Sequence, residues 1–372
     1  MIYLDYSANT PADEGVIAAF AECERSFAGN ANSNHVAGLA ARERMALACE
    51  RVAAMLGVQP SEVIFTSGAS EANNTAIKGV AHASRHKGRH IISTYLEHSS
   101  VSGCLTVLQE QGWDIDLVDI TREGKVDLEH LKSLIRDDTV LVAVTAVDSE
   151  LGTVQPIGEI AKIVAEHPNC RLHVDMTQAV GKIPLSLEGV DTAAIAPHKF
   201  YGLNGVGVLI KRRGLVIEPL IHGGASTTVY RSGTPALSLA VSAEKALQTA
   251  LGSFSDRLET VKRLNARLRA FLESKPDVRL NSPADAVPHI LNLSVNGIKG
   301  TVFQRTLSEK GICVSVKSAC STDGTPSRAV FAVSRDRRNA LSSWRISLSH
   351  LTTDAELDEF EQAYERCCQE LK

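Results

Sequence analysis

The chain has 372 residues, of which 44% are hydrophobic and 22% charged, and its formal net charge is −4. This length exceeds one average domain and suits a two-domain enzyme subunit, and the composition is that of a globular protein. A slightly acidic balance without a basic tail argues against a nucleic-acid-binding protein. We interpret the short arginine-rich run at residues 335–338 as a solvated loop.

The N-terminal residues 1–6 contain neither a positively charged region nor an apolar core of signal-peptide length. No run of residues approaches the roughly 18 uninterrupted apolar residues that a membrane helix needs. We therefore expect a cytoplasmic protein without a membrane partner. The eight cysteines form no CxxC pair and no zinc-like cluster with histidine, so we expect thiols rather than disulfides, and no metal site.

Alternating helical and strand patterns begin near residue 36. Apolar spacing predicts a helix over residues 40–56, with Gly57 at its end. A helix is also predicted from Glu71. Strands are predicted at residues 63–65, 90–94, 115–118, 140–147, 171–175, 192–196 and 207–211. This alternation predicts βαβ units and a mostly parallel sheet covered on both faces.

A long helical stretch over residues 237–275 follows that block. Strands are then predicted at residues 289–294, 313–316 and 344–349, and a final helix at residues 354–371. This order indicates a smaller α+β domain. We expect the first dozen residues to pack with it or along the domain junction.

Three motifs carry candidate chemistry, and the first is the turn between Phe65 and Glu71. A strand ends there in small residues that open a helix, whose N-terminal N–H groups favour an anion such as a phosphate. Ser70 adds a hydroxyl group. Taken alone, Ser70 is also compatible with a plain helix cap, and no P-loop lysine follows it.

The second and third motifs follow two successive strands. Asp175 ends a predicted buried strand, where open α/β sheets bind ligands, although a helix cap is the alternative. An anion at this point would keep a pyridine nitrogen protonated, and Gln178 could reach the ring hydroxyl. Lys199 follows the next strand and Pro197; a desolvated lysine there could form an imine, whereas a lone lysine at a strand exit is usually exposed.

In this order, the three motifs resemble fold-type I pyridoxal-phosphate enzymes, specifically the cysteine desulfurases of the class V aminotransferase group. Matching blocks cover nearly the whole chain: Tyr3-Leu4-Asp5, Glu97 to Ser100, Asp175 to Gln178, His198-Lys199, Arg231 to Thr234, Ser318 to Cys320, and Arg345. The resemblance implies an α/β fold with a mostly parallel seven-stranded sheet in a large cofactor-binding domain, residues 13–250. Residues 1–12 and 251–372 would form the small α+β domain.

The resemblance also implies a role for each cofactor-binding residue. Pyridoxal 5′-phosphate would form a Schiff base with Lys199, which then acts as the base that removes the α-proton. Asp175 would pair with the ring nitrogen and Gln178 with the ring oxygen. His98 would stack on the ring and assist proton transfer, although a helix-capping or core histidine is the alternative. The phosphate would be held by the Ala69 backbone, Ser70 and His198, with Thr234 reaching it from the other subunit of an obligate homodimer.

The reaction implied is the conversion of L-cysteine to L-alanine. Arg345 would bind the substrate carboxylate, with Asn30, Ala8 and Ser149 in the same site. Cys320 lies in a small, polar, turn-rich segment, and its thiolate would attack the substrate sulfur and keep it as a persulfide. The long loop from Cys320 to Arg345 resembles that of desulfurases which carry the sulfur to an acceptor protein. The acceptor would be a scaffold for iron–sulfur clusters or an enzyme that thiolates tRNA or a cofactor.

Alternatives to this function remain open. A selenocysteine lyase or another C–S lyase is the nearest, followed by a class V aminotransferase in which Cys320 is incidental, and then by a non-enzymatic scaffold. The sequence also departs from the family pattern around the site. Asp148 and Ser149 replace two asparagines, Ala196 replaces a phosphate-binding serine, and residues 5–10 and 225–228 differ from the usual blocks. We expect the core chemistry to be retained, with the substrate preference and the acceptor left open.

Overall fold

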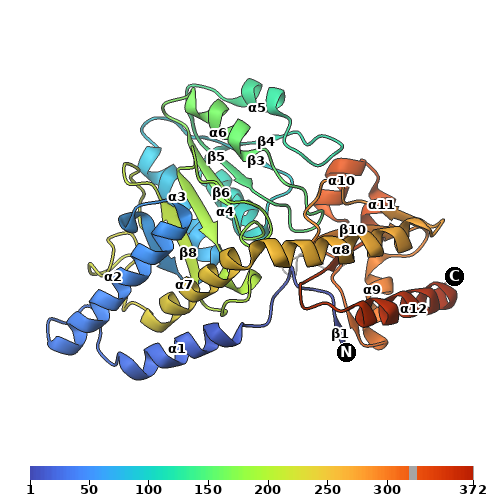
Figure 1. The fold of residues 1–372 in the computed structure, drawn as a ribbon. Helices are drawn as coiled ribbons and strands as arrows, with labels where there is room; N and C mark the ends of the chain where they lie inside the picture. The colour runs from blue at the N-terminus through green and yellow to red at the C-terminus, as the bar shows by residue number, and fades with distance from the viewer. Residues whose placement is uncertain (318–324, 372) are drawn as a thin grey trace.

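The computed structural model describes residues 1–317 and 325–371. Within them, a seven-stranded sheet has the order β2-β8-β7-β6-β5-β3-β4. Figure 1 shows this sheet with β3, β4, β5, β6 and β8 labelled. Strand β8 runs antiparallel to both of its neighbours, whereas β4, β3, β5, β6 and β7 pair in parallel. The strands are β2 (Val63–Thr66), β3 (His90–Thr94), β4 (Asp114–Val118), β5 (Thr139–Thr145), β6 (Arg171–Asp175), β7 (Thr192–Ile195) and β8 (Gly207–Lys211). The predicted mostly parallel seven-stranded sheet is confirmed.

Both faces of this sheet are buried, as a parallel sheet requires. Neighbouring residues of β5 belong to different cores because side chains alternate between the two faces of a strand. Leu141 packs in the core that includes residues of α3 (Ala69–Ser84) and α4 (Ser99–Glu110). Val142 packs in the core that includes residues of α6 (Ile157–Ala165) and α7 (Leu237–Gly252). The continuous apolar runs of the strands therefore follow from burial on both sides.

The other helices surround this sheet or belong to the C-terminal part. They are α1 (Glu14–Ser26), α2 (Val36–Leu56), α5 (Leu128–Leu134), α8 (Phe254–Glu273), α9 (Gly300–Glu309), α10 (Arg328–Ser334), α11 (Arg337–Ser342) and α12 (Asp354–Leu371). The predicted end of α2 is confirmed, because Gly57 caps it in the left-handed conformation with φ 65°. The helix begins four residues before its predicted start, where the ring of His35 accepts a hydrogen bond from the Gly38 N–H.

The predicted helical stretch over residues 237–275 consists of two helices. Helix α7 ends at Gly252, and α8 begins at Phe254. Ser253 between them has φ −106° and ψ 11°, which is not helical. Glycine is the weakest helix former after proline, so the break falls beside it.

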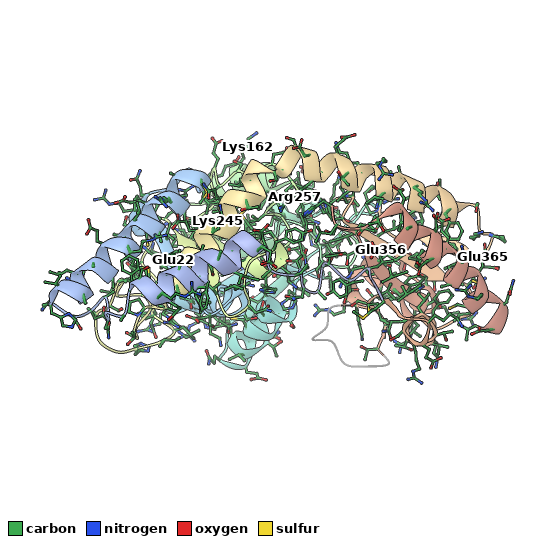
Figure 2. All side chains as sticks on the ribbon, turned by 60° about the horizontal axis from the view of Figure 1, so that its bottom comes forward. Glu22, Lys162, Lys245, Arg257, Glu356 and Glu365 are labelled. Carbon is green, nitrogen blue, oxygen red and sulfur yellow. The ribbon has the colours of Figure 1, made fainter. Side chains whose placement is uncertain are left out.

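A second sheet of three antiparallel strands has the order β12-β10-β9. Its strands are β9 (Val278–Leu280), β10 (Ile290–Val295) and β12 (Ser343–Ser347). A separate core packs around it, where Trp344 stacks on Phe303 with ring centroids 5.0 Å apart. Figure 2 shows α8 running from the large sheet, near Arg257, toward α12, which carries Glu356 and Glu365. This is the predicted smaller α+β part.

The N-terminus joins this second part through β1 (Ile2–Tyr3), which pairs in parallel with β11 (Ile312–Cys313). The strand predicted at residues 313–316 thus ends at Cys313. Ser315, which was predicted to belong to it, forms an isolated bridge with Arg345 instead. In the portion of the chain that is described, no helix combines the length and apolarity needed to cross a membrane.

Candidate active site

A cavity of about 390 Å³ lies where β5, β6 and β7 end, at the carboxyl edge of the large sheet. Ligands bind at this edge in open α/β sheets. Ten residues predicted from the sequence line the cavity: Ala8, Ala69, Ser70, His98, Ser149, Asp175, Gln178, His198, Lys199 and Arg345.

Two other predicted residues do not line this cavity. Asn30 lies in the loop before α2, where its side-chain oxygen accepts a hydrogen bond from the Asn32 N–H at 2.9 Å. Thr234, assigned to the other subunit, is also absent from the lining. Cys320 lies outside the described residues. Among residues 1–317 and 325–371, no group of three or more His, Cys, Asp or Glu side chains is placed to hold a metal ion.

The turn between β2 and α3 forms one end of the cavity. Gly68 is the cap residue of α3 and has no side-chain capping bond, so the first N–H groups of the helix are available to an anion. Glu71 is held by the Ser67 N–H at 2.7 Å and pairs with Arg231 at 3.0 Å. A Cβ atom on Gly207 would lie 2.5 Å from the Gly68 carbonyl carbon, so this packing of β8 against the turn requires glycine.

Asp175 is fixed from two sides at the end of β6. Its Oδ1 accepts the Thr177 N–H at 2.9 Å, and its Oδ2 accepts the side-chain amide of Asn73 at 2.8 Å. The other end of that amide, Asn73 Oδ1, contacts Nε2 of His173 at 2.9 Å. Burial lowers the pKa of His173 to about 4, so this ring is neutral. The carboxylate of Asp175 is therefore oriented by a buried, uncharged network.

His98 is connected to the same network through Ser100. The amide of Asn73 donates to Ser100 Oγ at 2.9 Å, and Ser100 Oγ lies 2.9 Å from His98 Nδ1. The Ser100 N–H also donates to Nδ1, so His98 caps α4 and lines the cavity at once. Burial lowers the pKa of His98, which favours the neutral ring. Because Nδ1 is an acceptor, the ring proton is on Nε2.

Lys199 ends a short 3₁₀ turn, η2 (Pro197–Lys199), directly after β7. Its Nζ donates to the carbonyl oxygens of Ser7 at 2.9 Å and Ala8 at 2.5 Å. The Ser7 carbonyl also accepts the Gln178 side-chain amide at 2.9 Å. The N-terminal loop thus places one acceptor between Lys199 and Gln178.

Arg345 is contributed by β12 and is only 1% exposed. Its Nη1 donates to the Ser149 carbonyl at 2.7 Å, and its Nη2 pairs with Asp5 Oδ1 at 2.8 Å. Its Nε is buried and has no hydrogen-bond partner among the described residues. Since buried polar groups are normally hydrogen-bonded, the guanidinium retains capacity for a further acceptor such as a carboxylate.

Two buried acids to which the sequence analysis gave no role, Glu97 and Asp148, lie behind the cavity wall. Glu97 accepts the Thr94 hydroxyl at 2.7 Å and the Thr145 N–H at 3.0 Å, and burial raises its pKa to about 8. Asp148 accepts the backbone N–H groups of the next turn, and burial together with the charge of Glu150 raises its pKa to about 7. At neutral pH both carboxyl groups are at least partly protonated.

Comparisons with known proteins agree over the whole chain. The aminotransferase class-V family model matches residues 2–360. The cysteine desulfurase IscS of Dictyoglomus turgidum is 36% identical over 376 residues, an alignment that covers 100% of this chain and 95% of that protein. A solved NifS-like protein has a TM-score of 0.93 and 35% identity, with 100% of both chains covered. A structure of SspA in complex with cysteine has a TM-score of 0.83 and 29% identity, covering 95% of this chain and 100% of that one.

Proposed function

The chain belongs to the class-V aminotransferase family, and from this membership and its cavity we infer that it is a cysteine desulfurase. One observation carries the inference most strongly. Lys199, Asp175, the anion-binding turn at Gly68 and the buried guanidinium of Arg345 surround a single cavity. A lysine, an acid and a phosphate turn suit pyridoxal phosphate, and the arginine suits an amino-acid carboxylate.

Enzymes of this family use pyridoxal phosphate, and the residues of this cavity fit it. The uncapped N-terminus of α3 offers N–H groups to a phosphate, and Asp175 presents a fixed carboxylate. We assign the phosphate to Ala69, Ser70 and His198. When bound, the cofactor supplies an electron sink that makes the Cα proton of an amino acid acidic. Ala196 offers no hydroxyl to the phosphate, so the helix N-terminus carries more of its binding.

The side chains of the cavity carry out substrate binding and proton transfer. Arg345 binds the substrate carboxylate through the part of its guanidinium that Asp5 and Ser149 leave unused. Lys199 would hold the cofactor and take the proton from the substrate Cα. The neutral ring of His98 would offer its Nε2–H group to the cofactor, while Ser100 fixes Nδ1. Gln178 would offer an amide N–H group to the ring oxygen.

Cys320 supplies the step that separates desulfuration from transamination. Its thiolate attacks the sulfur of the bound cysteine, forming a new S–S bond. The C–S bond breaks and its electron pair stays with the substrate carbon, which takes up a proton and leaves as alanine. Cys320 then carries the persulfide until an acceptor protein, a cluster scaffold or a thiolation enzyme, removes the outer sulfur. The name IscS of the Dictyoglomus relative supports a role in sulfur transfer.

We also propose that two copies of the chain form a homodimer in the cytoplasm. The resemblance assigns Thr234 to the phosphate of the cofactor bound in the other subunit. The position of Thr234 outside its own chain's cavity supports this assignment. Ser226 donates a hydrogen bond to Asn32 at 3.2 Å and so joins its loop to the segment that precedes α2. Val229 after Ser226 and Val36 at the start of α2 are 65% and 84% exposed, and a second subunit that covered both would fit the proposed dimer.

Incubation with L-cysteine and a thiol reductant tests the proposal. Wild type should release sulfide and alanine in equal amounts, and Cys320→Ser should lose both at least about 100-fold. Cys49→Ser, which removes a part-buried cysteine of α2, is the matched control and should react like wild type. A keto acid in place of alanine would identify an aminotransferase. A strong preference for selenocysteine would identify the lyase, and undiminished sulfide release by Cys320→Ser would refute the persulfide step.

A further inference from the structure

A second, much smaller cavity of about 20 Å³ lies behind Lys199. Ser7 and Lys199 line both cavities, so they form the wall between them. Arg257 reaches the small cavity from the start of α8, between the two parts of the molecule (Figure 2). The lining of this cavity also includes Lys182, a lysine that the chemistry proposed above does not use.

Lys182 lies seven residues after the end of β6 and is 7% exposed. Its Nζ donates a short hydrogen bond to Oε1 of Gln178. The Nε2 of the same amide donates to the Ser7 carbonyl at 2.9 Å, where Lys199 also donates at 2.9 Å. A hydrogen-bonded chain therefore runs from Lys182 through Gln178 and Ser7 to Lys199.

This chain fixes the orientation of the Gln178 amide. The ammonium form of Lys182 has hydrogen-bond donors and no acceptor, so Oε1 rather than the NH2 group of Gln178 faces it. The N–H groups of Gln178 must then face Ser7 and the main cavity. Without Lys182, the amide could turn over and present its oxygen to a ligand that offers an oxygen of its own.

Lys182 is surrounded by cations and neutral groups. The titratable and charged groups that line the small cavity with it are Tyr6, Lys199, Tyr201, Arg257, His289 and His350. His198 and Arg345 do not line this cavity but interact with the charge of Lys182. None of these is a carboxylate, and Asp13, which acts on His350, does not line the cavity. Burial, and then the charges of Lys199 and Arg345, lower the pKa of Lys182 to about 7. Electrostatic coupling is mutual, so a charge on Lys182 opposes a second charge on Lys199.

We propose that Lys182 is a positioning residue that orients the Gln178 amide and disfavours a proton on the nitrogen of Lys199. The inference rests on the proposed function, because it concerns the nitrogen through which Lys199 holds the cofactor. Lys182 acts through Gln178 and through its charge. It sets the pH range in which Lys199 is ready to accept a proton.

The test is a pH titration of the visible absorption of the purified enzyme with its bound cofactor. The midpoint of this titration reports protonation of the nitrogen that joins the cofactor to Lys199. In Lys182→Met it should rise by about one pH unit, because a neighbouring positive charge is lost. Lys182→Gln, also neutral, should give the same rise and serves if the methionine variant fails to fold. Lys182→Arg, which keeps the charge, should stay near the wild-type midpoint.

Lys211→Met is the matched control. Lys211 is 2% exposed and donates to the Leu215 carbonyl at 2.8 Å, and it pairs with Thr192 at the opposite end of β7 from Lys199. Its replacement removes a buried lysine and should leave the midpoint unchanged. A wild-type midpoint in folded Lys182→Met or Lys182→Gln with cofactor bound would overturn the role of Lys182. Absence of any cofactor absorption in wild type would instead overturn the proposed function.

Discussion

Replacing Asp148 by asparagine should stabilise the protein, and the gain should grow with pH. The carboxyl pKa rises from 3.8 to about 7 on folding, chiefly through burial. Between these values the unfolded chain loses a proton that the folded chain keeps, so the wild type loses stability as pH rises through this window. A pKa shift of about three units lowers the free energy of unfolding by about 4 kcal/mol, and this loss is complete above pH 7. Asparagine does not titrate, and its side-chain oxygen can accept the Glu150 and Leu151 N–H groups as Asp148 does.

Urea unfolding of both proteins at pH 5 and pH 8, at one protein concentration, measures this difference. The advantage of Asp148→Asn should increase by about 2–3 kcal/mol between the two pH values. Asp148→Ala removes the acceptor of the two backbone N–H groups and should be less stable than Asp148→Asn at both pH values. An advantage that is equal at pH 5 and pH 8 would refute the reasoning, since it would mean that Asp148 ionises normally in the folded protein.

Three further predictions concern the walls of the cavity. Asn73→Ala removes the amide that holds Asp175 and should weaken cofactor binding about 10-fold or more, measured by equilibrium dialysis, with the overall fold retained in circular dichroism. Gly207→Ala forces a Cβ against the Gly68 backbone and should lower the free energy of unfolding by about 1–3 kcal/mol, together with cofactor content. Arg345→Lys loses the planar fork and should raise KM for L-cysteine about 10-fold or more, with a smaller change in kcat; an unchanged KM would exclude carboxylate binding there.

The sequence predicts the sheet and the residues at its carboxyl edge well, for a physical reason. Strands buried on both faces are short continuous apolar runs, and the residues that follow them must lie at one edge. Asp175 and Lys199 therefore come together whatever the details of the helices between them. The end of α2 can also be predicted from the sequence, because Gly57 takes a left-handed conformation that few other residues adopt.

The residues behind the cavity were not predicted, because their roles arise from contacts between distant elements. Asn73 lies on α3 and joins Asp175 on β6 to Ser100 on α4. Its only local signal is a polar residue one helical turn after Ser70, on a helix that is otherwise packed against the sheet. The sequence around Lys182 does not indicate its buried position, because a lysine in a turn is usually exposed to solvent.

The break between α7 and α8 illustrates a different limit. Good helix formers precede Gly252, the weaker formers Ser253, Phe254 and Ser255 follow it, and a single glycine costs only about 1 kcal/mol in a helix. Tertiary packing decides whether such a stretch bends, and here α7 packs on the large sheet while α8 continues into the second core. Gly252 marks a possible position for the break, but the pattern of residues does not show which core each of the two helices packs into.

The central claim is that Lys199 holds pyridoxal phosphate in this cavity. The most direct test is to reduce the purified protein with borohydride, digest it, and locate the cofactor mass by peptide mapping. The cofactor should be found on the peptide that contains Lys199, and it should be absent from this peptide in Lys199→Ala. Recovery of the label on Lys182 or on another lysine, or no label in wild type, would contradict the claim.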